Sequence, residues 1–210
     1  SSPDDQFFSA GTFGALVEDS QGFYILSNNH VLANENRLPL RSAIFQPGII
    51  DDGNPTTDQI AELENFIFLE PGVFNKVDCA IAKVMDRSQV SNSIIGIGPP
   101  RGVGRAFNDM IVHKFGRSTG YRAGRVTSIN TDLKLKYKTG SFLFEEQIII
   151  QGLNGNIFAD QGDSGSLVLQ RETQMAVGLL IGVGRSNTGN AFAVANQISE
   201  VLRLFRVRLA

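Results

Sequence analysis

Short apolar segments separated by turn-forming residues are the feature of this 210-residue chain that most limits its possible folds. Each segment has the length of a β-strand, and Gly, Asn, Asp and Pro occupy many of the positions between them. Strands punctuated in this way are typical of an all-β domain. The strands that we predict lie at residues 14–17, 22–27, 80–84, 110–115, 124–129, 147–151, 166–169, 176–182 and 190–194.

Two parts of the chain depart from this pattern. Near the C-terminus, apolar residues recur at intervals of three and four, which gives a helix one apolar face; they are Ile198, Val201, Leu202 and Phe205. Residues 99–106 are rich in Pro and Gly, which indicates a linker. We therefore expect an N-terminal domain over residues 1–98 and a C-terminal domain over residues 107–210. The segment 34–69 has no clear pattern, and we expect a surface loop at residues 51–57.

Composition excludes several classes of function. The chain has 19 basic and 21 acidic residues and a net charge of −2, which offers no sign of a nucleic-acid or membrane partner. No apolar run approaches the roughly 20 residues that span a bilayer. No pattern of metal or cofactor ligands is present, and the sequence does not indicate an oligomeric state.

Cysteine content bears on the compartment. Cys79 is the only cysteine, so no intrachain disulfide is possible. This favours an intracellular, reducing compartment and leaves secretion open, because many secreted bacterial enzymes also lack disulfides. The chain begins at Ser1 without an initiator methionine or a signal peptide, which predicts a mature or trimmed form.

The stretch Gly-Asp-Ser-Gly-Ser at residues 162–166 indicates acyl-transfer chemistry. Its glycines allow a tight turn that exposes one hydroxyl, that of Ser164. The same turn can direct two amide N–H groups, those of Gly162 and Ser164, at one point in space. A nucleophile and an oxyanion hole from a single loop are what acyl transfer requires, although such a turn is also ordinary loop chemistry.

A serine nucleophile needs a general base, and the chain has two histidines. His30 follows a strand-like run and precedes a short helical turn, so it would sit at a rigid strand end. His113 lies in the middle of a strand-like run, where a structural role is the simpler interpretation. Cys79 is a poor alternative nucleophile, because it lies in an apolar strand with no histidine near it in sequence.

The base in turn needs a carboxylate that fixes its tautomer. Asp78 stands out among the acidic residues because its neighbours are apolar, and burying a carboxylate there is costly unless hydrogen bonds satisfy it. The alternative is an acid on the solvent face of an edge strand.

Three motifs together resemble the trypsin/chymotrypsin-like serine peptidases, and most of all their disulfide-free, bacterial-type members. They are His30 in Leu-Ser-Asn-Asn-His-Val-Leu, Asp78 in Val-Asp-Cys-Ala-Ile-Ala and Ser164 in Gly-Asp-Ser-Gly-Ser, in the chain order of that family. Residues 114–120 followed by 123–126 resemble the first hairpin of its second barrel, and residues 176–182 resemble its substrate-flanking strand. The resemblance implies two six-stranded antiparallel β-barrels, the first with His30 and Asp78 and the second with Ser164, and a C-terminal helix packed against the second barrel.

The same resemblance implies a serine endopeptidase that cleaves peptides or proteins through an acyl-enzyme. His30, Asp78 and Ser164 would form the catalytic triad, and the N–H groups of Gly162 and Ser164 the oxyanion hole. The implied substrate-binding residues are Phe158, Ala159, Gln161, Ile181, Gly182 and Val183. Phe158 occupies the position where an enzyme selective for Arg or Lys would carry an acid, so we expect an apolar or small residue at P1. A packing role is the alternative for Phe158.

The chain differs from well-known family members in two respects. Ser166 replaces a frequent glycine, and the amino terminus lacks the Ile/Val-Val/Ile-Gly-Gly pattern. Activation by a new N-terminal amine beside Asp163 is therefore not supported, and Asp163 needs another partner or solvent. Three alternatives to a general endopeptidase stay open: a catalytically silent binding module, an esterase, and a self-processing domain of a longer precursor.

Overall fold

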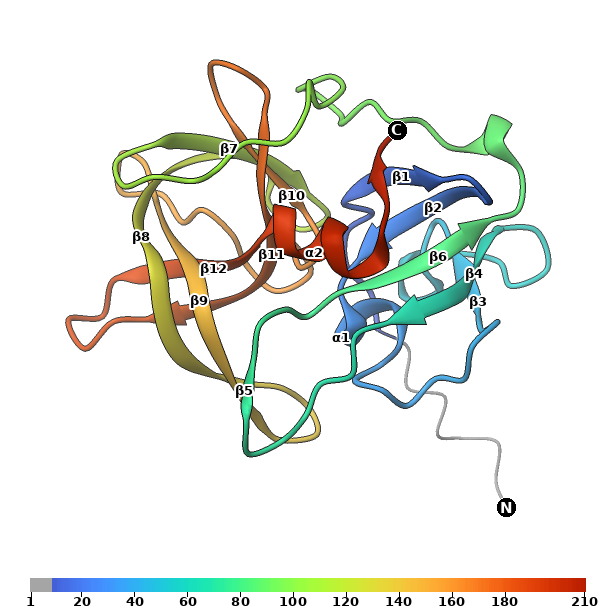
Figure 1. The fold of residues 1–210 in the computed structure, drawn as a ribbon, viewed down its shortest axis with the longest axis horizontal. Coiled ribbons are helices and arrows are strands. Elements are labelled where there is room, and N and C mark those ends of the chain that lie inside the picture. The colour runs from blue at the N-terminus through green and yellow to red at the C-terminus, as the bar shows by residue number, and fades with distance from the viewer. Residues whose placement is uncertain (1–8) are drawn as a thin grey trace.

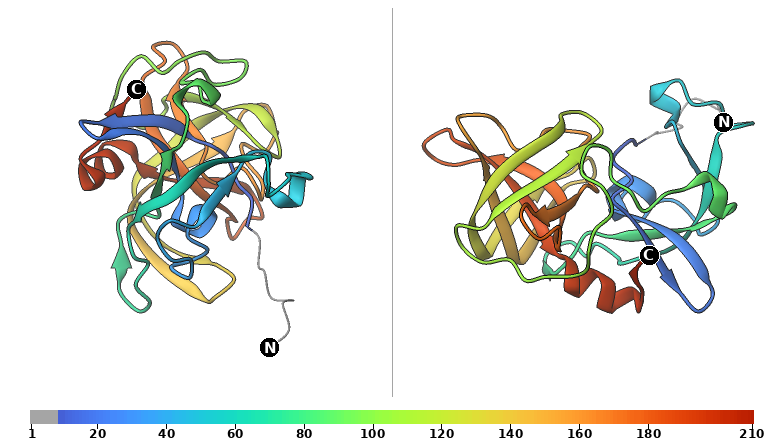
Figure 2. Two further views of the ribbon diagram at one scale, coloured as in Figure 1. Left: turned by 90° about the vertical axis from the view of Figure 1, so that its right-hand side faces the viewer. Right: turned by 90° about the horizontal axis from the view of Figure 1, so that it is seen from above.

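The computed structural model describes residues 9–210, and these fold into two β-sheets that lie side by side. Strands from the first part of the chain form most of one lobe, and later strands form the other (Figure 1). The view from above shows helix α2 (Ile198–Phe205) lying along one side where the two lobes meet (Figure 2).

The first sheet has six strands in the order β13-β1-β2-β6-β4-β3. Its antiparallel neighbours place the end of β2 opposite the start of β6, with Ser27 paired to Ala80. The strands are β1 (Ala15–Asp19), β2 (Gly22–Ser27), β3 (Ala43–Phe45), β4 (Gln59–Phe66), β6 (Ala80–Val84) and β13 (Arg208–Leu209).

The second sheet has seven strands in the order β12-β11-β10-β7-β8-β9-β5, and β12 also pairs with β9. This additional pairing closes the sheet into a barrel. The strands are β5 (Phe74–Asn75), β7 (Ile111–Gly116), β8 (Gly120–Lys136), β9 (Ser141–Gly152), β10 (Leu167–Gln170), β11 (Ala176–Arg185) and β12 (Ala191–Gln197). The seventh strand, β5, comes from the first half of the chain and pairs in parallel with β9.

The predicted all-β architecture is confirmed, and its details differ at a few places. Strands β2 and β6 have the predicted bounds, whereas β8 and β9 extend well beyond the predicted 124–129 and 147–151. Strand β4 was not predicted, because a register shift between Leu63 and Asn65 breaks the alternation of apolar and polar side chains. Two short 3₁₀ helices, η1 (Ile49–Asp51) and η2 (Arg87–Gln89), lie in the connections.

Helix α2 carries the predicted apolar face and uses it to join the lobes. Ile198, Val201, Leu202 and Phe205 are buried in one cluster that also holds Leu26 of the first sheet and core side chains of the second. Burying each such side chain stabilises the fold by about 1.5–3 kcal/mol. After α2 the chain crosses to the first sheet, where β13 pairs with β1. Within residues 9–210, no helix has the length and apolar character needed to cross a membrane.

Candidate active site

The pairing of β2 with β6 brings His30 and Asp78 together. His30 lies in the short helix α1 (Asn29–Leu32) directly after β2, and Asp78 lies just before β6. The His30 Nδ1 atom contacts Asp78 Oδ2, and the His30 backbone N–H donates a hydrogen bond to Asp78 Oδ1 at 3.2 Å. The Asp78 side chain is fully buried, while 17% of the His30 side chain is exposed. The buried Asp78 carboxylate therefore contacts the Nδ1 edge of an imidazole that is itself partly exposed to solvent.

Asp78 is satisfied by partners from three parts of the chain. Its backbone N–H donates to Asn196 Oδ1 at 2.9 Å, and its carbonyl accepts from Asn28 Nδ2 at 2.8 Å. The Tyr137 hydroxyl donates to Asp78 Oδ2 at 2.8 Å. The bonds from Tyr137 and His30 offset the cost of burying the carboxylate, and the other two fix the backbone of Asp78. None of the three partners was predicted from sequence.

The loop that carries Ser164 packs against the end of β2. Thr12 N–H donates to the Ser164 carbonyl at 2.8 Å, and the Gly165 N–H donates to the Leu180 carbonyl at 2.8 Å. Gly165 has a φ of +93°, and a Cβ at this position would lie 2.2 Å from Ser27 Oγ, the last residue of β2. Only glycine allows this approach. The contact places the half-buried Ser164 near the strand end from which His30 extends.

The hydroxyl and the imidazole are not joined by a direct bond. Within residues 9–210, no hydrogen bond links Ser164 Oγ to His30 Nε2. In structures without substrate such catalytic hydrogen bonds are often long and tighten only in the reacting complex.

Two backbone N–H groups of the loop are free to bind an anion. Gly162 has a φ of +93°, and a Cβ there would lie 2.2 Å from Ser118 Oγ, so this position also requires glycine. In the described part of the chain, neither Gly162 N–H nor Ser164 N–H donates a hydrogen bond. Free N–H groups on a constrained turn have the chemistry of an oxyanion hole.

Asp163 has a buried partner, Lys114 of β7. The two side chains are fully buried, with 2.9 Å between Lys114 Nζ and Asp163 Oδ2. Asp163 also accepts from the Thr119 hydroxyl at 2.7 Å and from the N–H groups of Ser118, Thr119 and Asp160 at 2.9–3.0 Å. Burial raises the pKa of Asp163, but the bonds from Thr119 and Lys114 outweigh it and leave the pKa below its usual value. Lys114 is therefore the internal counter-ion of Asp163 in this loop.

The six residues implied in substrate binding divide among three surroundings. Phe158 and Ala159 are buried in the core of the second barrel, and Val183 packs against that core. Ile181 is buried in a separate cluster, and a Cβ at the neighbouring Gly182 would lie 3.4 Å from Leu135. Gln161 is exposed. The burial of Phe158 accords with its packing alternative, and the role of all six in binding stays a prediction.

The other histidine and the cysteine are both buried, and Cys79 directly follows Asp78 in the chain. His113 is buried on β7 and packs edge-on against Tyr121, with ring centroids 5.7 Å apart. Burial lowers its pKa, which favours the neutral ring. Cys79 is also buried.

Comparisons with known proteins identify the family. The model of peptidase family S64 matches residues 25–207 of the chain. The chain belongs to this family. It is thus a member of a serine peptidase family with the chymotrypsin fold, with one cysteine and no disulfide.

Other known proteins share a more distant similarity with the chain. A probable periplasmic serine protease do/HhoA-like of Haemophilus influenzae is 23% identical over 172 residues, which cover 80% of this chain and 35% of that protein. The chain thus spans about a third of the length of this relative. Protease A of Thermobifida fusca shares the fold with a TM-score of 0.65 and 16% identity, over 97% of this chain and 94% of that one. The Nocardiopsis protease does so with a TM-score of 0.65 and 15% identity, over 96% and 98%.

Removing the Lys114 charge is expected to destabilise the S64 chain strongly. Lys114→Met keeps the length of the side chain but leaves the buried Asp163 carboxylate without its counter-ion. Breaking a buried pair from one side costs about 3–5 kcal/mol. Denaturant unfolding measures this loss. Lys76→Met is the matched control, because Lys76 pairs with Glu146 on the surface and its loss should change stability little. Equal stability of the Lys114→Met and wild-type proteins would contradict the role given to Lys114.

Thiol reagents are expected to leave the folded protein unmodified. Burial raises the pKa of Cys79 well above its usual value, and the negative charge of Asp78 adds to this effect. The thiolate that would react with iodoacetamide is therefore scarce and inaccessible at neutral pH. Mass spectrometry after alkylation measures the modification, and the unfolded protein is the positive control. Rapid alkylation of the folded protein would show that Cys79 is accessible.

Proposed function

We propose that this member of family S64 is a serine endopeptidase that cleaves peptide bonds through a His30–Asp78–Ser164 triad and an acyl-enzyme. The observation that carries the proposal is the buried Asp78 carboxylate held on His30, at the strand end against which the Ser164 loop packs. A carboxylate bound to an imidazole, with a serine loop packed beside the same strand end, supplies the parts of a serine nucleophile with its general base.

The first half of the reaction forms the acyl-enzyme. His30 Nε2 takes the proton of the Ser164 hydroxyl as Ser164 Oγ bonds to the scissile carbonyl carbon. Negative charge moves onto the carbonyl oxygen, where the N–H groups of Gly162 and Ser164 donate hydrogen bonds to it. The C–N bond then breaks, and His30 gives the proton to the leaving amine. Asp78 keeps the proton of His30 on Nδ1, so that Nε2 is the atom that accepts.

The second half returns the enzyme to its starting state. A water molecule gives a proton to His30 and attacks the acyl carbon, and the oxyanion forms again. Collapse of this intermediate breaks the bond to Ser164 Oγ, which recovers its proton from His30. No step requires a metal or an organic cofactor.

The substrate preference that we propose is an apolar or small residue at P1. Support comes from the residues that the family resemblance assigns to the pocket. Phe158, Ala159, Ile181 and Val183 carry no charge, so no counter-ion for a basic or acidic P1 side chain is available from them.

A fluorophosphonate probe tests the reaction, because only an activated serine reacts with it appreciably. We expect stoichiometric labelling of the folded protein at Ser164, none after unfolding, and cleavage of a peptide library after apolar or small residues. Labelling without peptide cleavage, but with cleavage of activated esters, would favour an esterase. Absence of labelling would contradict the proposal and favour a silent binding module.

A further inference from the structure

We propose that Tyr137 is a positioning residue for the Asp78–His30 pair, and that Glu35 holds Tyr137 in place by binding the tip of the β8–β9 hairpin. The hairpin tip is defined here as residues 136–141, between the long strands β8 and β9. The inference rests on the proposed function, in which Asp78 and His30 belong to the catalytic triad.

Tyr137 contacts both members of the pair. Its hydroxyl donates to Asp78 Oδ2 at 2.8 Å, the same oxygen that contacts His30 Nδ1. Its ring packs edge-on against the His30 ring, with centroids 5.1 Å apart and an interplanar angle of 80°. Burial, and then the charge of Asp78, raise the pKa of Tyr137 well above its usual value, so the hydroxyl stays protonated and donates. The Tyr137 hydroxyl therefore fixes the oxygen that orients the imidazole.

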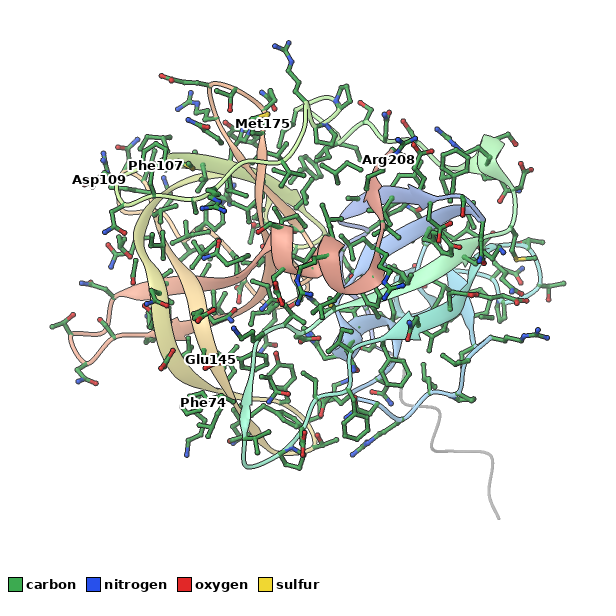
Figure 3. The ribbon with its side chains drawn as sticks, in the orientation of Figure 1. Phe74, Phe107, Asp109, Glu145, Met175 and Arg208 are labelled. Atoms are coloured by element: carbon green, nitrogen blue, oxygen red, sulfur yellow. The ribbon has the colours of Figure 1, made fainter. Side chains whose placement is uncertain are left out.

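The length of the hairpin brings Tyr137 to this position. Strand β8 has 17 residues and β9 has 12, and their ends form a cluster that includes Leu135, Phe142 and Phe144. Tyr137 packs edge-on against Phe142, with centroids 5.4 Å apart. Strand β5 pairs in parallel with the same end of β9, and Figure 3 shows Phe74 of β5 beside this end of the hairpin. A side chain of the second lobe thus reaches the catalytic acid of the first.

Glu35 joins the hairpin tip to the segment that follows His30. Its carboxylate accepts hydrogen bonds from Lys138 N–H at 3.0 Å, from Thr139 N–H at 2.8 Å and from the Thr139 hydroxyl. Glu35 itself is buried, with 6% of its surface exposed. A carboxylate that accepts three hydrogen bonds from one turn holds that turn firmly.

The backbone around Glu35 supports a dedicated role. Asn34, Glu35 and Asn36 have φ values of +47°, +58° and +69°, a run of left-handed residues without glycine. Such a run is unfavourable and persists only where surrounding contacts compensate for it. Asn36 supplies such contacts, because its side chain accepts from Leu69 N–H and donates to the Leu69 carbonyl, each at 2.9 Å. The result of this conformation is that Glu35 faces the hairpin tip.

The proposal makes a specific prediction for Tyr137→Phe, which removes the hydroxyl and keeps the ring. We expect kcat for peptide hydrolysis to fall about 10-fold with KM unchanged, the size expected for one hydrogen bond to a charged group. We expect the NMR resonance of the His30 Nδ1 proton to move downfield, because Asp78 Oδ2 then has no second donor and binds this proton more strongly.

Tyr121→Phe is the matched control. Tyr121 lies on β8 and also packs edge-on against a histidine, His113, but 41% of it is exposed and its hydroxyl makes no hydrogen bond to Asp78. This control should leave kcat and the resonance of the His30 Nδ1 proton unchanged. Glu35→Gln should also lower kcat. The double variant with Tyr137→Phe should lose little more kcat than Tyr137→Phe alone, because both changes act through one hydroxyl.

The decisive measurement is the NMR resonance of the His30 Nδ1 proton in wild type, Tyr137→Phe and Tyr121→Phe, alongside steady-state kinetics. The NMR measurement needs no turnover, so a protein that fails to hydrolyse peptides would end the proposed function and still leave the positioning role measurable. An unchanged resonance and an unchanged kcat in folded Tyr137→Phe would overturn the inference. If Tyr137→Phe does not fold, Glu35→Gln takes its place, and an unchanged resonance and kcat in that folded variant would overturn the inference as well.

Discussion

Replacing Ser164 with alanine is expected to lower kcat about 10⁶-fold, the effect of removing the nucleophile from other serine peptidase triads. The variant keeps the turn, because Gly162 and Gly165 supply its left-handed backbone and the Ser164 carbonyl still accepts from Thr12. Stability should therefore change little, and fluorophosphonate labelling should disappear. Residual hydrolysis would come from the N–H groups of the loop and from substrate binding alone.

The neighbouring Ser166 provides the control for this experiment. Its hydroxyl donates to the Asp163 carbonyl at 2.6 Å and is buried, so the structure gives it a bonding role inside the loop. Ser166→Ala should lose about 1 kcal/mol of stability and keep its labelling. The opposite pattern, with labelling lost in Ser166→Ala and kept in Ser164→Ala, would assign the nucleophile to Ser166 and refute the proposed triad.

Local sequence was sufficient for the parts of the fold whose side chains alternate regularly. Strands β2 and β6 were predicted at their bounds, since neither contains a register shift. The pairing between β8 and β9 shifts register at three places, between Val126 and Ser128 and twice more before Leu133. Each shift breaks the period of two on which strand prediction depends. The extended hairpin was missed for this reason, and Tyr137 with it.

Residues of the candidate site could be predicted where a sequence motif marked them. Those that reach the site only through a long-range contact could not. Asp78 was singled out because a charged side chain lay among apolar neighbours. The same argument applies to Lys114, which lies between His113 and Phe115 in an apolar strand. It would have indicated a buried lysine that needs an acidic partner. The identity of that partner, Asp163, depends on the packing of the second barrel and is not visible from sequence.

Replacing Asp78 with asparagine is expected to lower kcat about 10⁴-fold, as in other triads of this type. In the wild type, Asp78 accepts at both oxygens: Oδ1 from the His30 N–H, and Oδ2 from His30 Nδ1 and the Tyr137 hydroxyl. An amide has one oxygen and one NH₂ group. Turning the oxygen to the backbone N–H of His30 leaves the NH₂ group facing Nδ1. The imidazole then carries its proton on Nε2 and cannot accept the proton of Ser164.

The opposite orientation of the amide is also unfavourable. It places the NH₂ group against the His30 backbone N–H, and two donors cannot form a hydrogen bond with each other. We therefore expect Asp78→Asn to lose kcat and keep its KM, as measured by steady-state kinetics. Thermal unfolding should show that the variant is folded. Asp109→Asn is the control, since Asp109 is exposed at the far end of the second lobe (Figure 3) and should keep wild-type activity. Wild-type turnover by Asp78→Asn would mean that Asp78 does not set the tautomer of His30, and it would contradict the proposed triad.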